Sequence, residues 1–329
     1  MRFRNSIRLL MENSKQAFRL FICRAVIAVA AIALCAAFVL PELIEIGKSS
    51  QFQTLYEDVK AVFKALTSLN GTELDQAKSA LFGKGGSLPK FLNLLSSKMV
   101  EITLVTVGCI LVYLLKRFAE TVCYFSVGSI LNDKMTTYAE TNFSTAFVAN
   151  LGKASAYAAF YVPAVFFFDV VTLAICYVFL AFLPFLFGIF LSVTIVVFCQ
   201  SLKLTLTGSW MPAMTADGKR ARDAVFKKSN RGKKQTLKAF ANYVVTVYAL
   251  IIVNVVSAIC TFGSALLITV PASFFLLICT QYVQYYTENG KKYFITYERI
   301  ATNPDHGDRE RFFEYMAQEE KKDDSQKEN

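Results

Sequence analysis

The chain has 329 residues, 54% of them apolar, and a formal net charge of +10 at pH 7. Soluble domains are about 45–50% apolar, and the excess here is concentrated in a few long runs. The single histidine, His306, excludes any metal cage or acid–base dyad that needs two histidines. The eight cysteines form no C-x-x-C pair, which argues against a zinc site or a disulfide framework. We expect no metal and no cofactor.

The first 24 residues are expected to form a basic amphipathic leader on the cytoplasmic side. Six cations lie between Arg2 and Arg24, and apolar residues recur near helical spacing, as in helices that lie among lipid headgroups. The alternative is a disordered basic leader. Residues 25–40 form an apolar run that predicts the first span. A cleaved signal peptide is the competing interpretation of this region, although the leader is long for one.

Residues 41–98 are expected to form a small helical extracytoplasmic segment. Apolar residues within 52–66 fall on one helical face. A turn at Asn70-Gly71 separates this helix from a second one, which Gly83 ends. Ser87 is expected to open a third helix that leads into the second span. The first two helices should either pack against each other or lie on the membrane.

Five further spans are expected after this segment. Lys116 and Arg117 close the apolar core of the second. Residues 154–202 and 239–287 are runs of 49 residues with one charge and none, respectively. Since a span needs about 20 apolar residues, each run is long enough for two. The breaks are expected at Leu183-Pro184 and at 261–263. The predicted spans after the first are 102–115, 156–181, 185–202, 240–260 and 264–286, within a membrane domain of residues 25–302.

The segment 203–238 is strongly basic, with ten Lys/Arg against two Asp and hence a net charge of +8. Six spans place this loop, the leader and Lys116-Arg117 on one side, which the positive-inside rule assigns to the cytoplasm. Residues 41–98, with seven cations and six acids, fall on the other side. We therefore predict an all-α, polytopic integral membrane protein of the cell membrane with both termini cytoplasmic. A charged cytoplasmic tail, 303–329, is expected to end in disorder.

The basic loop also predicts contact with anionic membrane lipids, at about 1 kcal/mol per surface Lys or Arg. Trp210, the only tryptophan, lies where an interfacial anchor is expected. Nucleic-acid binding is not expected, because Phe226 is the only aromatic residue among the clustered cations and one ring is a poor stacking platform. The candidate lipid-contacting residues are Lys219, Arg220, Arg222, Lys227, Lys228, Arg231, Lys233 and Lys234.

Asp169 is the only charged residue in the run 154–202, and a carboxylate at mid-span costs about 2.5–3.5 kcal/mol on insertion scales. It lies 13 residues after the start of the third span, and Asn254 lies 14 after the start of the fifth. Both spans start on the cytoplasmic side, so we predict an intramembrane polar pair. The pair would either clamp two helices or serve proton or cation coupling. Near the span ends, interfacial positions are expected for Gln200, Gln281 and Gln284.

No motif of nucleophilic, metal-dependent or phosphate-binding catalysis is present, since GKGG at 83–86 lacks the strand and the Lys-Ser/Thr that a phosphate loop needs. We therefore predict a non-enzymatic scaffold, lipid-interacting or regulatory membrane protein. The alternative is a transporter or flippase for an apolar or amphipathic substrate, with Asp169 as coupling acid. The few charges within the spans favour the first interpretation, because paths for polar solutes need polar lining. No protein partner can be inferred.

Two stretches carry a family resemblance. They are LTGSWMPAMTADGKRARDAVFKKSNRGKKQTLKAF at 206–240 and YVQYYTENGKKYFITYERI at 282–300. They resemble bacterial six-span membrane proteins that are similar to the membrane domain of some glycerophosphodiester phosphodiesterases. The resemblance implies a helical membrane fold in a bacterial cell membrane. No phosphodiesterase sequence accompanies it in these residues, so it implies no activity and no site residues.

Overall fold

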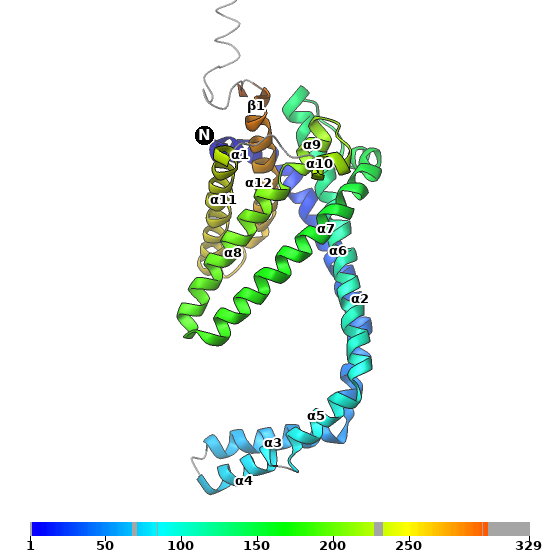
Figure 1. Cartoon of the computed structure of the whole chain (residues 1–329), viewed down its shortest axis with the longest axis vertical. Helices are drawn as coiled ribbons and strands as arrows, with labels where there is room; N and C mark the ends of the chain where they lie inside the picture. The colour runs from blue at the N-terminus through cyan, green and yellow to red at the C-terminus, as the bar shows by residue number, and fades with distance from the viewer. Residues whose placement is uncertain (1, 68–70, 84, 227–232, 298, 302–329) are drawn as a thin grey trace, which may run out of the picture. The chain divides into compact units, whose positions relative to one another are not determined.

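The computed structural model describes residues 2–67, 71–83, 85–226, 233–297 and 299–301. Within them the chain is helical except for its turns and one short pair of strands (Figure 1). The elements are α1 (Arg2–Glu12), α2 (Ser14–Lys48), α3 (Ser50–Thr67), α4 (Gly71–Phe82), α5 (Ser87–Ser97), α6 (Met99–Thr137), α7 (Phe143–Phe182), α8 (Phe185–Thr207), α9 (Trp210–Ala216), α10 (Ala221–Phe226), α11 (Lys233–Cys260), α12 (Leu266–Glu288), β1 (Tyr293–Thr296) and β2 (Arg299–Ala301).

Six of the described helical segments are long and apolar enough to cross a membrane. They are Ser14–Lys48, Met99–Thr137, Phe143–Phe182, Phe187–Ala216, Gln235–Cys260 and Leu266–Glu288. Their number and order confirm the predicted all-α, multi-pass membrane fold. Exposed large apolar side chains are frequent along them, as expected for helices whose outer faces meet lipid.

The chain divides into two compact units, which are described separately. One comprises residues 27–116, and the other comprises 1–26 together with 117–329. In the first unit, α3, α4 and α5 pack against one another, with the rings of Phe52 and Phe91 5.9 Å apart. Of the two arrangements considered for the first two helices in 41–98, the structure shows α3 packed against α4, and α5 starts at Ser87 as predicted.

Two helical hairpins supply four of the spans in the second unit. Helices α7 and α8 pack together, as do α11 and α12 (Figure 1). The first hairpin turns at Leu183-Pro184, as predicted, because Pro184 has no N–H to continue the helix. The second turns at Phe262 and Gly263, both with positive φ. Glycine adopts this left-handed backbone without the usual steric cost, so the second expected break is also confirmed.

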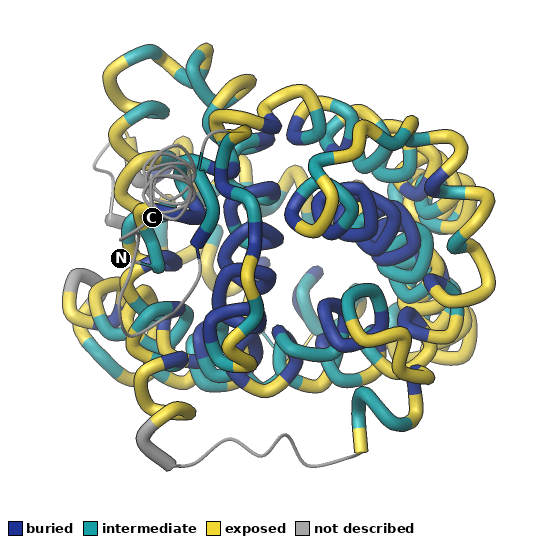
Figure 2. The backbone as a smooth tube through the Cα atoms, turned by 90° about the horizontal axis from the view of Figure 1, so that it is seen from above, coloured by how far each residue is buried: buried dark blue, intermediate teal, exposed yellow. Residues whose placement is uncertain are grey.

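Helix α6 extends well past Lys116 and Arg117, the residues expected to close the second span. Its C-terminal part buries Phe125, Leu131 and Met135 in the core of the second unit. This packing stabilises the helix beyond the end of its apolar run. Gly128 lies in this core, where an added Cβ would lie 2.7 Å from the sulfur of Met211. Figure 2 shows buried, half-buried and exposed residues following one another along the long helices.

The basic segment 203–238 is more helical than expected. Helix α8 runs on to Thr207, α9 and α10 follow, and α11 already begins at Lys233. Buried side chains explain the extension, since Leu204, Met211 and Met214 are all in the core. Only residues 217–234 therefore separate the fourth and fifth spanning helices. The predicted tail, 303–329, lies outside the described residues.

A short antiparallel pair, β1 and β2, follows α12 and was not expected from the sequence. It packs against α1, and the Asn5 amide donates to the Tyr293 hydroxyl at 3.1 Å. Nearby, Asp217 accepts hydrogen bonds from Tyr285 and Lys291 and pairs with Lys219 at 3.1 Å. Burial raises the pKa of Asp217, but these three donors outweigh it, so the pKa is lowered overall.

Candidate functional site

Asp169, on α7, is held between two cations that come from two other helices. Its Oδ2 lies 3.2 Å from Nη2 of Arg117 on α6, and its Oδ1 lies 3.2 Å from Nζ of Lys203 on α8. The Gln200 amide, one turn before Lys203, donates to the same Oδ1 at 3.4 Å. Three helices are thus joined at one carboxylate, by charge-assisted contacts that are stronger than neutral hydrogen bonds.

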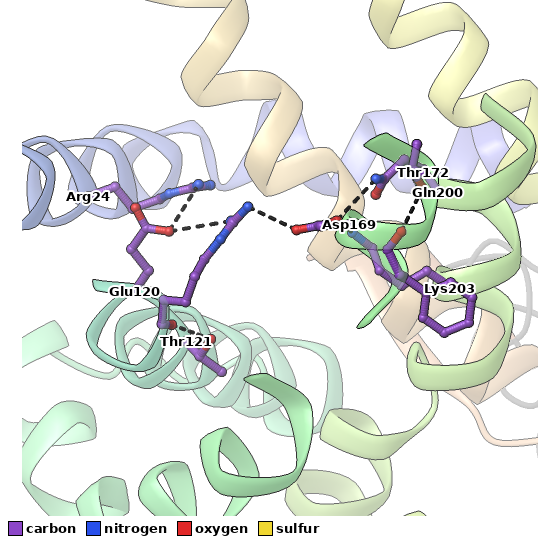
Figure 3. Close-up of polar contacts among 9 residues, drawn as sticks. Arg24, Glu120, Thr121, Asp169, Thr172, Gln200 and Lys203 are labelled. Atoms are coloured by element: carbon purple, nitrogen blue, oxygen red, sulfur yellow. Dashed lines mark hydrogen bonds and ion pairs between the residues drawn. The ribbon is translucent and has the colours of Figure 1, made fainter. Parts of the chain in front are cut away.

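Glu120, also on α6, continues the network. Its Oε2 lies 3.7 Å from Nη1 of Arg117 and 3.4 Å from Nη2 of Arg24 on α2. The Arg24 guanidinium also lies 3.7 Å from the centre of the Phe274 ring on α12, a cation–π contact. Figure 3 shows Arg24 and Glu120 on one side of the network and Asp169, Gln200 and Lys203 on the other.

The network is an alternating row of charges. In order it runs Arg24, Glu120, Arg117, Asp169 and Lys203, so each carboxylate stands between two cations. Three cations face two acids, which leaves one excess positive charge among these residues. Ion pairs largely removed from water are individually strong, but they carry a desolvation cost that makes the removal of any one partner expensive.

The five charged residues of the network, which contact one another in a row, form one part of the wall of a cavity of about 530 Å³, its charged end. The rest of the wall is mainly apolar and comes from α7, α8, α11 and α12. Tyr124 and Tyr161 also border the cavity, and within the described part of the chain neither hydroxyl has a hydrogen-bond partner. The apolar lining residues are Val162, Val165, Leu204, Val247, Leu250, Ile251, Val255, Phe274 and Leu277. The cavity therefore joins a charged end to a hydrophobic wall, a shape suited to an amphipathic molecule.

The predicted direct pair of Asp169 and Asn254 does not form. The Asn254 amide donates to the Ser273 hydroxyl at 2.8 Å and accepts from the Thr269 hydroxyl at 2.9 Å, both on α12. It thereby ties α11 to α12, while Asp169 ties α7 to α6 and α8. The two residues nevertheless line the same cavity. Each group has its hydrogen-bond or ion-pair partners on helices other than the one predicted.

Sequence reasoning missed four members of the network. Arg24, Arg117 and Lys203 were counted only among the basic residues that mark the cytoplasmic side, and Glu120 was given no role. The separation of Arg117 and Glu120 by three residues was a usable signal, because such pairs share a helix face. The interfacial positions of Gln200, Gln281 and Gln284 stay a prediction, but the structure shows what these side chains contact. Gln200 binds Asp169, Gln284 accepts from Asn242 at 3.2 Å, and Gln281 is buried.

The candidate lipid-contacting residues are only partly described. Arg220 and Arg222 are exposed, and Lys219 is exposed but paired with Asp217. Lys233 and Lys234 begin α11. Trp210 begins α9 and is half-buried, and its role as an interfacial anchor stays a prediction. The positions outside the described residues are Lys227, Lys228 and Arg231.

In the other unit, three carboxylates of Glu42, Glu45 and Glu101 lie within 4.8 Å of one another. The ammonium group of Lys98 contacts all of them, with Nζ 3.2 Å from Glu101 Oε2 and 3.9 Å from Glu42 Oε2. Its contact with Glu45 is the first cause of a raised pKa for Lys98. These acids are already neutralised in part by an amine, so this arrangement is a salt-bridge cluster.

No protein-family model, curated protein or solved structure matches this chain. Its function is therefore inferred from the geometry of the cavity and the charges around it.

Proposed function

We propose that this is a non-enzymatic, lipid-interacting membrane protein that holds an amphipathic lipid in the cavity lined by Asp169 and Asn254. The observation that carries the proposal is the joining of a charged row to an apolar wall in one cavity of about 530 Å³. A small polar solute would make no contact with the apolar wall. A hydrocarbon would offer no polar group to the charged side chains. An amphipathic molecule satisfies both.

The depth of the charged row supports a lipid. Arg24 directly precedes the first apolar run, Arg117 follows the second, and Lys203 follows the fourth. All three border their apolar runs on the predicted cytoplasmic side, within helices that continue past Arg117 and Lys203. In this proposal the charged row lies within reach of lipid headgroups on that side. The basic segment with exposed Arg220 and Arg222 would add attraction for anionic lipids on that side. We also propose that the chain is related to the bacterial six-span proteins that it resembles, and that it lies in the cell membrane.

The roles of the two carboxylates also support binding. Asp169 and Glu120 each stand between two cations, so their charges fix the positions of helices. Transport with Asp169 as coupling acid would need this carboxyl group to take up a proton in each cycle. Protonation would remove the counter-ion shared by Arg117 and Lys203, both 3.2 Å away. We therefore favour a static role for Asp169 within a lipid-holding or scaffolding protein.

Filling the cavity tests the proposal. The full chain is purified in a mild detergent, and bound lipid is measured by native mass spectrometry. Ile251→Trp places a large ring at the apolar wall, whereas Ile259→Trp, on the same helix, places it at a position that is 71% exposed. Wild type and Ile259→Trp should keep bound lipid, and Ile251→Trp should lose most of it. Equal retention by all three would show that the lipid is held elsewhere.

A further inference from the structure

The charged end of the cavity has more positive charge than its own acids neutralise. Arg24, Arg117 and Lys203 supply three cations, and Glu120 and Asp169 supply two carboxylates. All five side chains belong to one compact unit, and Lys203 and Glu120 are the most buried of them. An excess charge held away from water attracts a counter-ion much more strongly than one on the surface.

Further donors surround this excess charge. The Tyr124 and Tyr161 hydroxyls line the cavity and, among the described residues, have no hydrogen-bond partner within the protein. A tyrosine hydroxyl can donate to an anion. The Arg117 guanidinium offers a planar fork that suits the oxygens of a phosphate or carboxylate. Together with Lys203, these donors come from α6, α7 and α8 and line the same cavity.

We propose that this end of the cavity binds the anionic headgroup, phosphate or carboxylate, of a membrane amphiphile whose chain lies along the apolar wall. Arg117 and Lys203 are the principal cations for the headgroup, with Arg24 as the third. Asp169 competes with the headgroup for Arg117 and Lys203 and so limits the affinity. This assignment rests on the proposed function. It adds that the ligand is anionic and names the residues that bind its charged headgroup.

The competition gives opposite effects for two variants. Lys203→Gln removes a cation from the headgroup, and we expect roughly 10- to 100-fold weaker binding, as for the loss of one charge-assisted hydrogen bond. Asp169→Asn removes the competing anion, and we expect binding about tenfold tighter. Arg222→Gln, an exposed change on α10, is the matched control and should shift affinity less than threefold. A merely structural role for Asp169 would not tighten binding.

The test uses the purified full chain in detergent, with calorimetry of three probes: dihexanoyl phosphatidate, dihexanoyl phosphatidylcholine and inorganic phosphate. The proposal expects phosphatidate to bind most tightly, to weaken with added salt, and to respond to the two variants in opposite directions. Should Lys203→Gln fail to fold, Lys203→Arg takes its place and should keep binding within a few-fold. The salt titration and the headgroup comparison on wild type decide the question without any variant.

Each other outcome overturns a different part. Inorganic phosphate binding as tightly as phosphatidate would show a free-anion site and reject the amphiphile. Equal binding of phosphatidate and phosphatidylcholine, insensitive to salt and to both variants, would reject the anion site but leave the proposed lipid-holding function intact. Binding of none of the lipids, together with no lipid retained on purification, would reject the proposed function itself.

Discussion

Replacing Asp169 by Asn should destabilise the membrane domain markedly, although the two side chains have nearly the same shape. The change removes the carboxylate that pairs with Arg117 and Lys203. Lys203 has no other salt bridge in the described structure, so it would be left as a nearly buried charge. An amide can still accept one hydrogen bond through its carbonyl oxygen.

The magnitude follows from burial. The Asp169 and Lys203 side chains are 18% and 11% exposed, so this pair is close to the buried case, in which removing one partner costs about 3–5 kcal/mol. Arg117 is 33% exposed and keeps Glu120, so its share is nearer the surface value of about 0–1 kcal/mol. The retained amide hydrogen bond returns about 1 kcal/mol. We expect a net loss of about 2–5 kcal/mol.

The assay is denaturant unfolding in one detergent, comparing wild type, Asp169→Asn, Lys203→Gln and the double variant. Glu140→Gln, at an exposed position, is the control for a lost negative charge. If the pair is real, the double variant should be more stable than the two single losses add up to, by about 0.5–3 kcal/mol. A loss below 0.5 kcal/mol for Asp169→Asn, or strictly additive losses, would refute the reasoning.

Three further predictions concern the core, acid stability and topology. Gly128→Ala should lower stability in thermal unfolding by about 1–3 kcal/mol, because the added methyl group crowds the core. Gly152→Ala, where a Cβ meets nothing within 4 Å, should be neutral or stabilising. Similar losses of stability for the two variants would contradict this. Because the pKa of Asp217 is lowered, its stabilisation is complete above an unfolded-state pKa of about 3.9 and is lost as pH falls through the folded-state value. Asp217→Asn should therefore unfold more easily at pH 7 and lose less stability on acidification, and identical acid profiles would be evidence against the role. In a cysteine-free background, Ser50→Cys should react with an impermeant thiol reagent outside intact cells and Arg222→Cys should not, and the reverse pattern would reject the predicted orientation.

The number of spans was predictable because the apolar runs are long and nearly free of charge. Both hairpin turns were predictable as well, since Pro184 and Gly263 have local conformational reasons to break a helix. The strands after α12 were not, because β1 and β2 are four and three residues long and so short an alternation gives little signal. Their contact with α1 joins the two ends of the described chain.

The site was half predictable. Asp169 and Asn254 stand out because polar groups in an apolar run are costly, and both line the cavity. Their partners could not be read in the same way. Arg117 and Lys203 border their apolar runs, where basic residues usually mark orientation, and a long side chain there can point inward as well as outward. Which way each points depends on how the helices are rotated against one another, and a single sequence does not carry that information.

The most direct test of the central claim is to locate the bound amphiphile by photo-crosslinking. A phosphatidate with a diazirine near the end of one acyl chain is bound to the purified full chain and activated, and the labelled peptides are identified by mass spectrometry. The account predicts labelling along the cavity wall, at Leu250 on α11 and Leu277 on α12, that excess dihexanoyl phosphatidate suppresses. Labelling confined to outward positions such as Ile259 and Leu267, unaffected by the competitor, would contradict it.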